Sequence, residues 1–385
     1  LSKGNLMKNL LILTVGTGTA GIHSNLAQGL RNTIEKIVPR QFWLVPSSSE
    51  DSRAVAELVA EKQPVFAGYL GPIENPDDLS CCRQTIREAI QQVKSLLQND
   101  EKLIVNPTSG TKQMSAGATI AALDEECGDI VFTVGERADG VVKTGTEAII
   151  EFGAAEFFRE RDLGIARKFF EAGDFYAAER LLWNHKNICR REYAISAIGL
   201  HWQRFDYVKA ASAAATYDQK LKDHLSLCAG VDYPDEKILA DILAWSFFAL
   251  RHNEPETGLR LAYKALEYAA RWFLYRDYKA VPDKNGRYDI RDCNKLKLSP
   301  GLQQRLDKPA GLNMTVKMLQ EQNHPFGNAV DRKLLELAVM RNENTHSIRP
   351  VAQKEAQAFY DRVRSAIRAV MPDFEPTPLP EKGIL

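Results

Sequence analysis

One short apolar segment near the start of the chain narrows the choice of fold. Residues Leu10–Val15 form a continuous run that stops at a glycine. Such a run is typical of a strand that is buried on both faces of a parallel sheet. Three similar runs follow, at 42–45, 65–70 and 103–105. Helix-patterned stretches such as 52–61 and 85–97 separate these runs, and the alternation predicts an α/β domain with a parallel sheet.

Turn residues mark the end of this domain. A fifth strand is expected over Ile130–Val134, and the turn Ala138–Gly140 comes before Val141–Val142 and Ala148–Phe152. This order predicts a hairpin at the edge of the sheet. We therefore expect the α/β domain to span residues 7–152.

The rest of the chain has a helical pattern. Gly173 and Asp174 separate two helices as a break and an N-cap, and Leu259–Leu274 carries an apolar stripe. Two further helices are expected over 331–341 and 350–371. This predicted all-α half has three parts, namely a connecting region over 153–235, a helical domain over 236–371 and an extended tail over 372–385.

Charge and cysteine content limit the partners. The 50 basic residues are matched by 50 acidic ones, which gives a formal net charge of zero. Because non-specific coating of nucleic acid needs many Lys and Arg contacts to phosphate, RNA binding would have to be local. The six cysteines contain no C-x-x-C pair, which favours free thiols in a reducing compartment and no bound metal. No apolar run approaches the roughly 18 residues that span a bilayer, so we expect a cytoplasmic protein without membrane contact.

Two loops at the carboxyl ends of predicted strands contain residues typical of a phosphate site. The first loop contains Gly16, Thr17, Gly18 and Thr19, and the second contains Asn106, Thr108, Ser109, Gly110, Thr111 and Lys112. Ligands of open α/β sheets bind at this end of the strands. Glycines let a phosphate approach the backbone, helix N-termini offer N–H groups, and the hydroxyls and the lysine add donors and charge. The alternative is a tight turn that binds nothing, because G-x-G-x-x-G arises easily by chance.

A second candidate site lies at the junction of the last two helices. Arg341 follows Leu334 and Ala338 at helical spacing, so a charge continues an apolar stripe and should face a partner or a cleft. Five residues rotate by about 140° beyond a full turn, so His346 would point away from Arg341 on a straight helix. The two side chains converge only if the helix ends between them, which Pro350 favours. Without further context, such an Arg–His pair is more often a chance occurrence.

Together these stretches resemble the CRISPR-associated Rossmann-fold (CARF) proteins that are joined to a HEPN ribonuclease domain, the ancillary nucleases of type III CRISPR systems. The residues that carry the likeness are Gly16–Thr19, Asn106–Lys112 in the form N-x-T-x-G-T-K, and Arg341-Asn342-x-x-x-His346. Their order and spacing match as well. The resemblance implies a Rossmann-like CARF domain at the N-terminus and a HEPN domain at the end of the helical half.

The same resemblance implies a ligand and an oligomeric state. CARF domains bind cyclic oligoadenylate, an allosteric activator, in a cleft between two copies of the domain. Here the contacts to phosphate or ribose would come from Lys112 and from the hydroxyls of Thr17, Thr19, Thr108, Ser109 and Thr111. HEPN nucleases bring two R-x4-H motifs from two subunits into one site. A homodimer is therefore expected, with the activator and no cofactor.

The implied reaction is metal-independent cleavage of single-stranded RNA. The 2′-OH would attack the neighbouring phosphate and leave 2′,3′-cyclic phosphate and 5′-OH ends. Arg341 would neutralise the phosphorane oxygens, His346 would act in proton transfer, and Asn342 would orient a phosphate oxygen or His346. Slow cleavage of the cyclic ligand by the CARF domain itself is a further hypothesis.

Two other functions also fit the sequence. An NAD(P)-dependent oxidoreductase would use Gly16–Gly21 as its dinucleotide loop, with Glu50 or Ser47–Ser49 near the ribose. Its usual Tyr-x-x-x-Lys pair occurs only as Tyr275 and Lys279, in a helical segment. A nucleotide sensor without catalysis would use the helical half to bind a partner.

Overall fold

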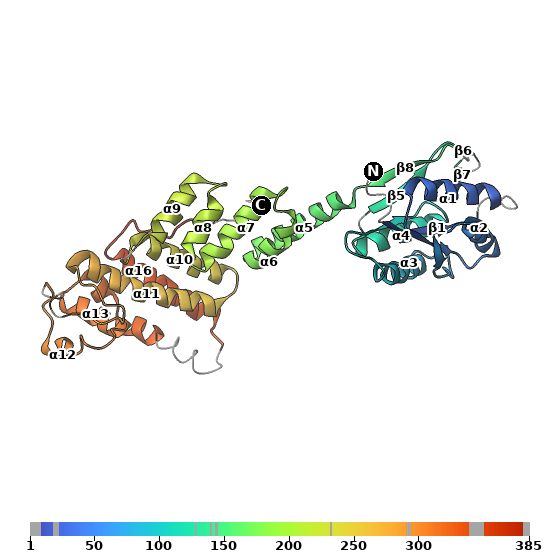
Figure 1. Ribbon diagram of the computed structural model, residues 1–385. Coiled ribbons are helices and arrows are strands. Elements are labelled where there is room, and N and C mark those ends of the chain that lie inside the picture. Colours follow the sequence, from blue (N-terminus) through green and yellow to red (C-terminus); the bar gives the residue numbers. More distant parts are fainter. Residues whose placement is uncertain are drawn as a thin grey trace. The chain divides into compact units, whose positions relative to one another are not determined.

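The protein folds into two compact units, Leu1–Arg161 and Asp162–Leu385 (Figure 1). The computed structural model describes residues 9–17, 23–127, 129–138, 141–142, 145–231, 233–289, 291, 293, 295–338 and 350–379. The first unit contains a mostly parallel sheet and the second is helical, which confirms the predicted α/β and all-α fold. None of the helices in these ranges is both long and apolar enough to cross a membrane.

A six-stranded sheet in the order β3-β2-β1-β4-β5-β8 forms the centre of the first unit. The strands are β1 (Asn9–Val15), β2 (Gln41–Pro46), β3 (Phe66–Tyr69), β4 (Lys102–Asn106), β5 (Asp129–Val134) and β8 (Ala148–Phe152). The first five are parallel, and β8 runs antiparallel to β5. Each parallel strand lies within one residue of its predicted range at either end.

Helices cover both faces of this sheet. They are α1 (His23–Ile37) and α2 (Glu50–Ala60) on one face, and α3 (Leu79–Lys94) and α4 (Lys112–Asp124) on the other. In β1, Leu10 and Ile12 pack under α3 and α4, whereas Leu11 and Leu13 pack under α1 and α2. Alternate residues of a strand point to opposite faces of the sheet, and helices cover both faces here. All four side chains are therefore fully buried. This two-sided burial explains the continuous apolar run in the sequence.

The predicted hairpin at the edge of the sheet is confirmed. The two short strands β6 (Arg137–Ala138) and β7 (Val141–Val142) pair with each other in a separate two-stranded sheet. The edge of the main sheet is β8, which pairs with β5 from Ile130↔Phe152 to Val134↔Ala148. Strands of two residues offer too few backbone groups to extend a sheet, whereas β8 pairs along most of β5.

Helical hairpins form the beginning of the second unit. They are built from the end of α5 (Ala154–Glu171) and from α6 (Phe175–Leu182), α7 (Arg190–Gln203), α8 (Tyr207–Ala214) and α9 (Gln219–Ala229), with a 3-10 turn η1 (Trp183–His185). Gly173 has a φ of 83°, and the Asp174 carboxylate accepts a 2.9 Å hydrogen bond from the N–H of Ala177. The predicted break and N-cap at these two residues are confirmed.

The remaining helices pack around the long helix α11. Their bounds are α10 (Glu236–Arg251), α11 (Pro255–Tyr278), α12 (Pro300–Gln303), α13 (Leu312–Glu321), α14 (Pro325–Ala329), a helix over 332–338, and α16 (Gln353–Arg368). The three helices between 300 and 329 were not predicted, because each has ten residues or fewer and leaves little periodicity to detect.

Two hydrophobic clusters fill the second unit. The connecting cluster contains Phe175, Trp202 and other side chains of α5 to α9. The C-terminal cluster contains Phe273, Phe359 and other side chains of α10 to α16. Helices α10 and α11 belong to both, because Trp245 and Leu261 lie in the connecting cluster while most of their other buried residues lie in the C-terminal one. The division into a connecting region and a final domain at residue 235 stays a prediction.

Candidate functional site

The two predicted loops lie where the strand order of the sheet reverses. β1 has β2 on one side and β4 on the other. The chain therefore moves outward from β1 to β3 and then returns to β4. Leu13 pairs in register with Asn106, which brings the carboxyl ends of β1 and β4 level with each other. Such a switch point is where open α/β sheets bind their ligands.

Ser109 holds the two loops together. Its Oγ accepts a 2.9 Å hydrogen bond from the N–H of Gly16, and its carbonyl accepts a 2.5 Å bond from Thr14 Oγ1. Only 8% of Ser109 is exposed. A Cβ on Gly16 would lie 2.7 Å from the backbone of Gly110, so only glycine allows this approach. The hydroxyl of Ser109 therefore positions the site and keeps one proton that it can donate.

Asn106 and Thr108 fasten the second loop to β5. Asn106 Nδ2 donates to Thr133 Oγ1 at 2.9 Å, and Asn106 Oδ1 accepts from the N–H of Thr108 at 3.0 Å. The N–H of Thr133 donates to Thr108 Oγ1 at 2.8 Å. Asn106 is almost fully buried, and Thr108 is half-buried. The predicted polar residues are therefore brought together, and Asn106 is a positioning residue within the loop.

Thr111 and Lys112 begin helix α4. Thr111 Oγ1 caps the helix by accepting from the N–H of Met114 at 3.1 Å, and it also donates to the carbonyl of Pro76. Its hydroxyl is thus already used in both directions. Lys112 is exposed at the first position of the helix, where free N–H groups and the helix dipole favour an anion. Of the second loop, Lys112 is the residue best placed to contact a phosphate.

The first loop is described only at its start. Gly16 is buried and Thr17 is exposed, while Gly18 and Thr19 lie outside the described residues. Ser52 on α2 supports this turn, since its hydroxyl donates to the carbonyl of Val15 at 2.7 Å and accepts from the N–H of Ser47 at 2.9 Å. The serines after β2 therefore hold the backbone that leads into the glycine loop.

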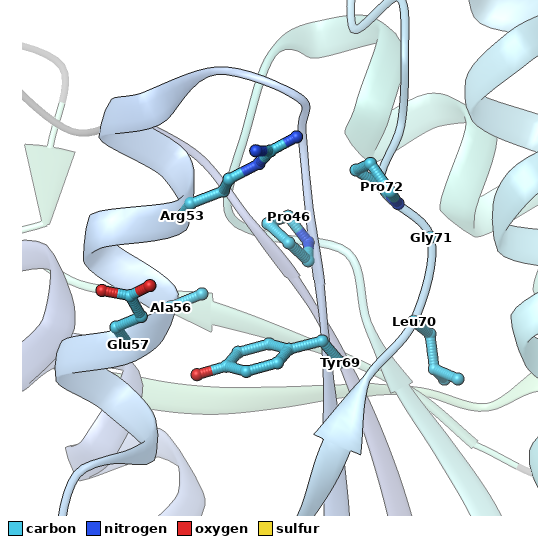
Figure 2. A pocket seen from close by; sticks show the side chains of 8 residues that line it. All are labelled: Pro46, Arg53, Ala56, Glu57, Tyr69, Leu70, Gly71 and Pro72. Carbon is cyan, nitrogen blue, oxygen red and sulfur yellow. The ribbon is translucent and has the colours of Figure 1, made fainter.

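A pocket of about 220 Å³ opens at the carboxyl ends of β2 and β3 (Figure 2). Its lining residues are Pro46, Arg53, Ala56, Glu57, Tyr69, Leu70, Gly71 and Pro72. Pro46 pairs in register with Val15, the residue before Gly16, so the pocket and the glycine loop share one edge of the sheet. No sequence motif pointed to this pocket, since its residues come from two strand ends and one helix.

Figure 2 shows a basic, an acidic and an aromatic side chain around this pocket. Arg53 and Glu57 project from α2, and Tyr69 extends its ring from the end of β3 toward that helix. Burial, and then the charge of Glu57, raises the pKa of the Tyr69 hydroxyl, so the hydroxyl stays a hydrogen-bond donor. A half-exposed aromatic face beside a guanidinium suits a planar, hydrogen-bonding ligand such as a nucleobase.

The predicted nuclease residues Arg341, Asn342 and His346 lie outside the described residues. The helix that leads to them, 332–338, buries Leu334 and Ala338 in the C-terminal cluster. Asp331 caps this helix, because its carboxylate accepts from the N–H of Leu334 at 2.7 Å. The predicted apolar stripe before Arg341 is therefore confirmed for these two residues.

The segment after the predicted motif is fixed by the same cluster. Helix α16 buries Phe359 and Val363 there, and Val351, shortly before the helix, is also buried. Arg362 on α16 lies 3.3 Å from the carboxylate of Asp331. The segments before and after residues 339–349 therefore both pack in the C-terminal cluster.

The Tyr-x-x-x-Lys pair of the oxidoreductase alternative belongs to the second unit. Tyr275 stacks on Tyr233 with ring centroids 5.0 Å apart, and Lys279 Nζ lies 5.1 Å from the centroid of the Tyr275 ring. The glycine loop belongs to the first unit. These contacts give Tyr275 and Lys279 a packing role at the end of α11.

Comparison with known proteins shows a shared fold. No family model matches the chain, and no curated protein matches it. Among solved structures, it is similar to Enterococcus italicus Csm6 bound to cyclic hexa-2′-fluoro-hexa-dAMP, with a TM-score of 0.63 and 12% sequence identity. The match covers 95% of this chain and 95% of that one, so it includes both units. The likeness to CARF–HEPN proteins is therefore confirmed at the level of the fold.

Proposed function

We propose that this protein is a ribonuclease of CRISPR antiviral defence that cyclic oligoadenylate activates. The observation that carries this proposal is the hydrogen bond from the N–H of Gly16 to Ser109 Oγ. It holds the two candidate phosphate-binding loops together at the switch point of the sheet. A second support is the fold shared over 95% of both chains with a Csm6 that was bound to a cyclic hexanucleotide analogue.

The activator would bind along the edge that the two loops and the pocket share. Lys112 and the N-terminus of α4 would contact phosphate, and the hydroxyl groups of Thr108 and Ser109 would donate to phosphate or ribose. Thr17, Gly18 and Thr19 would close the site from the first loop, and Tyr69 would stack on a base. A ring with internal symmetry suits two identical sites, so we infer a homodimer with the ring on its axis.

The nuclease chemistry would use the residues between 332–338 and α16. The 2′-OH of single-stranded RNA would attack the adjacent phosphorus while the P–O5′ bond breaks. Arg341 would stabilise the negative charge on the phosphorane oxygens, and His346 would give a proton to the 5′-oxygen that leaves. Asn342 would orient the phosphate or His346. No step of this reaction uses a metal ion, and the ends would be a 2′,3′-cyclic phosphate and a 5′-OH.

The experiment that tests this proposal is cleavage of a fluorogenic single-stranded RNA in EDTA, with and without cyclic tetra- or hexa-adenylate. We expect one ring to stimulate cleavage strongly. The double variant Arg341→Ala/His346→Ala should lose at least about 100-fold of this activity, the usual contribution of acid–base catalysis. The matched control is Arg332→Ala, which removes an arginine that is 92% exposed on the preceding helix and should leave cleavage unchanged.

The other outcomes decide against the proposal. RNA that stays intact with both rings would contradict the nuclease function. Cleavage that needs added divalent ions would contradict the mechanism. If Arg341→Ala/His346→Ala folds, binds the ring and cleaves like the unmodified protein, the catalytic pair is wrong.

A further inference from the structure

A histidine, a cysteine and an aspartate meet inside the connecting part of the second unit. His224 and Cys228 lie one turn apart on α9, and Asp241 faces them from α10. Asp241 is fully buried, Cys228 is 4% exposed and the His224 side chain is 22% exposed. One ligand atom of each residue lies within 4.8 Å of the other two. In the described parts of the chain, this is the one group of three His, Cys, Asp or Glu side chains so arranged.

The distances in this group match those between the ligands of a tetrahedral zinc ion. Zinc binds nitrogen and oxygen at about 2.0 Å and sulfur at about 2.3 Å, so neighbouring ligands of a tetrahedron are roughly 3.3–3.6 Å apart. Here His224 Nε2 is 3.0 and 3.3 Å from the two carboxylate oxygens of Asp241 and 3.8 Å from Cys228 Sγ. Small side-chain adjustments would bring all three atoms to bonding distance of one ion.

A buried tyrosine hydroxyl lies beside the group and has room for a further partner. Tyr207 is only 8% exposed, and its Oη makes no hydrogen bond of regular geometry within the residues that the structure describes. Tyr207 and Cys228 lie in the same connecting cluster, and the hydroxyl interacts with the carboxylate of Asp241. Buried polar atoms without partners are rare and often mark an ion or water that binds there.

The surroundings of Asp241 are those of a metal-binding carboxylate. Trp202 Nε1 donates to its Oδ2 at 2.8 Å, and Thr377 Oγ1 donates to its Oδ1. Such donors orient the carboxylates that bind metals. A purely hydrogen-bonded core would also satisfy Asp241, but it would leave the thiol of Cys228 with only a long contact of 3.8 Å to His224 Nε2.

We propose that His224 Nε2, Cys228 Sγ and Asp241 bind one zinc ion, with water as the fourth ligand near Tyr207. Thiolate and imidazole ligands in a tetrahedral group favour Zn²⁺ among the common metal ions. On binding, the Cys228 thiol releases its proton to solvent and the S–Zn bond forms. His224 binds as the neutral ring and gives up its hydrogen bond to Asp241. The ion reaches the site on the side where His224 is exposed, and it links α9 to α10.

From the sequence we expect no bound metal, since its cysteines form no C-x-x-C pair. The three ligands instead come from two helices, and His224 and Asp241 are 17 positions apart in the chain. This proposal is independent of the proposed function.

Cobalt titration of the untagged full-length protein tests the site. After treatment with a chelator and its removal, we expect Co²⁺ to produce a thiolate-to-cobalt charge-transfer band and tetrahedral d–d bands that saturate at one ion per chain. Added Zn²⁺ should abolish both signals. Cys228→Ser should lose the charge-transfer band. His224→Ala should weaken binding at least about tenfold, since loss of even an outer-shell partner of a metal ligand costs about 10- to 100-fold.

The matched control is Cys127→Ser, in the first unit. Cys127 is as buried as Cys228, and burial is the largest cause that raises the pKa of each thiol to about 12. This variant should keep both cobalt signals. If the unmodified protein shows no charge-transfer band, or if Cys127→Ser removes the band and Cys228→Ser keeps it, the site is overturned. Because the unmodified protein alone can give the negative result, a variant that fails to fold does not decide the question.

The zinc site and the metal-independent nuclease can be separated. RNA cleavage by Cys228→Ser in EDTA would show that the reaction needs no metal, whatever the result of the titration. Conversely, a protein that binds cobalt through Cys228 and cleaves no RNA would keep the metal site and refute the proposed function.

Discussion

The N–H of Gly16 donates a 2.9 Å hydrogen bond to Oγ of Ser109, although 93 residues separate the two in the chain. This bond fixes the distance between the loop after β1 and the loop after β4. It also explains why a serine is needed in a loop whose other hydroxyls hold β5 and cap α4. Hydrogen bonds within the protein thus hold together the two loops of the candidate ligand site.

Gly16→Ala should separate the two loops. Its Cβ would meet the Gly110 backbone at 2.7 Å, a contact that backbone atoms can only relieve by moving. Overpacking of this kind costs about 1–3 kcal/mol, so we expect the affinity for the activating ring to fall by about 5- to 150-fold. Calorimetric titration of the ring measures this change. Gly164→Ala is the control, since nothing lies within 4 Å of a Cβ there. Equal affinity of both variants would contradict the proposed ring site.

Lys112→Gln should weaken the same binding without changing the fold. The exposed ammonium group at the start of α4 is expected to form a charge-assisted hydrogen bond to phosphate. Loss of such a bond costs about 1.5–3 kcal/mol, which corresponds to a fall in affinity of about 10- to 150-fold. Lys62→Gln removes a lysine that is 89% exposed elsewhere in the first unit and should have no effect. Unchanged affinity and unchanged salt dependence in Lys112→Gln would remove Lys112 from the site.

Asp331→Ala should destabilise the helix that leads to Arg341. The variant loses the cap of helix 332–338 and the ion pair with Arg362. Loss of an N-cap costs about 1 kcal/mol, which lowers Tm by about 2–4 °C in a unit of this size. Arg362→Ala removes only the partly exposed ion pair and should cost below about 1 kcal/mol. Thermal unfolding compares the two, and equal losses for Asp331→Ala and Arg362→Ala would show that the cap contributes nothing beyond the ion pair.

His324 should make the second unit sensitive to mild acid. Its neutral ring accepts from the N–H of Phe326 through Nδ1 and donates from Nε2 to Asp277 at 2.9 Å. Burial, which outweighs the opposite effect of Asp277, lowers the pKa of His324 below its ordinary value of 6.5. The folded protein therefore binds this proton less tightly than the unfolded chain does. The contribution of His324 to stability is complete above the unfolded value and is lost as pH falls below it.

The measurement is Tm as a function of pH for the unmodified protein and for His324→Gln. Between about pH 6.5 and pH 4, the Tm of the unmodified protein should fall more steeply than that of the variant. Asp277 also has a lowered pKa, because donors including Arg276 and His324 outweigh its burial, but its contribution is lost only below its ordinary value of 3.8. Parallel curves for the two proteins in this range would contradict the assignment.

The parallel strands could be predicted because each appears in the sequence as a short continuous apolar run. A strand that is buried on both faces must be apolar throughout, as Leu10 to Leu13 are, and this requirement is visible without knowing its neighbours. The hairpin at the edge of the sheet could be predicted from its turn residues, but the segment that pairs with β5 could not. Whether β7 or β8 pairs with β5 depends on backbone contacts between segments, and both segments contain suitable residues.

The loop residues of the candidate site could be named from the sequence, but their individual roles could not. Thr111 and Lys112 are neighbours, yet the Thr111 hydroxyl is used inside the protein and Lys112 is exposed. The pocket with Arg53 and Tyr69, and the group of His224, Cys228 and Asp241, were both missed. Each joins residues from separate elements, and no spacing in the sequence records which elements pack together.

Helices α10 and α11 belong to both hydrophobic clusters of the second unit, so the two clusters should unfold together. Trp245 packs against Phe175 and Trp202 on one side, while neighbouring residues of α10 fill the C-terminal cluster. Opening of either cluster would remove apolar contacts from α10 and α11. The amide protons of α7 and of α11 should therefore exchange with solvent at similar slow rates, in one cooperative event. A fragment that begins at residue 236 would lack the Phe175 and Trp202 side chains that pack on Trp245. It would expose Trp245 and aggregate.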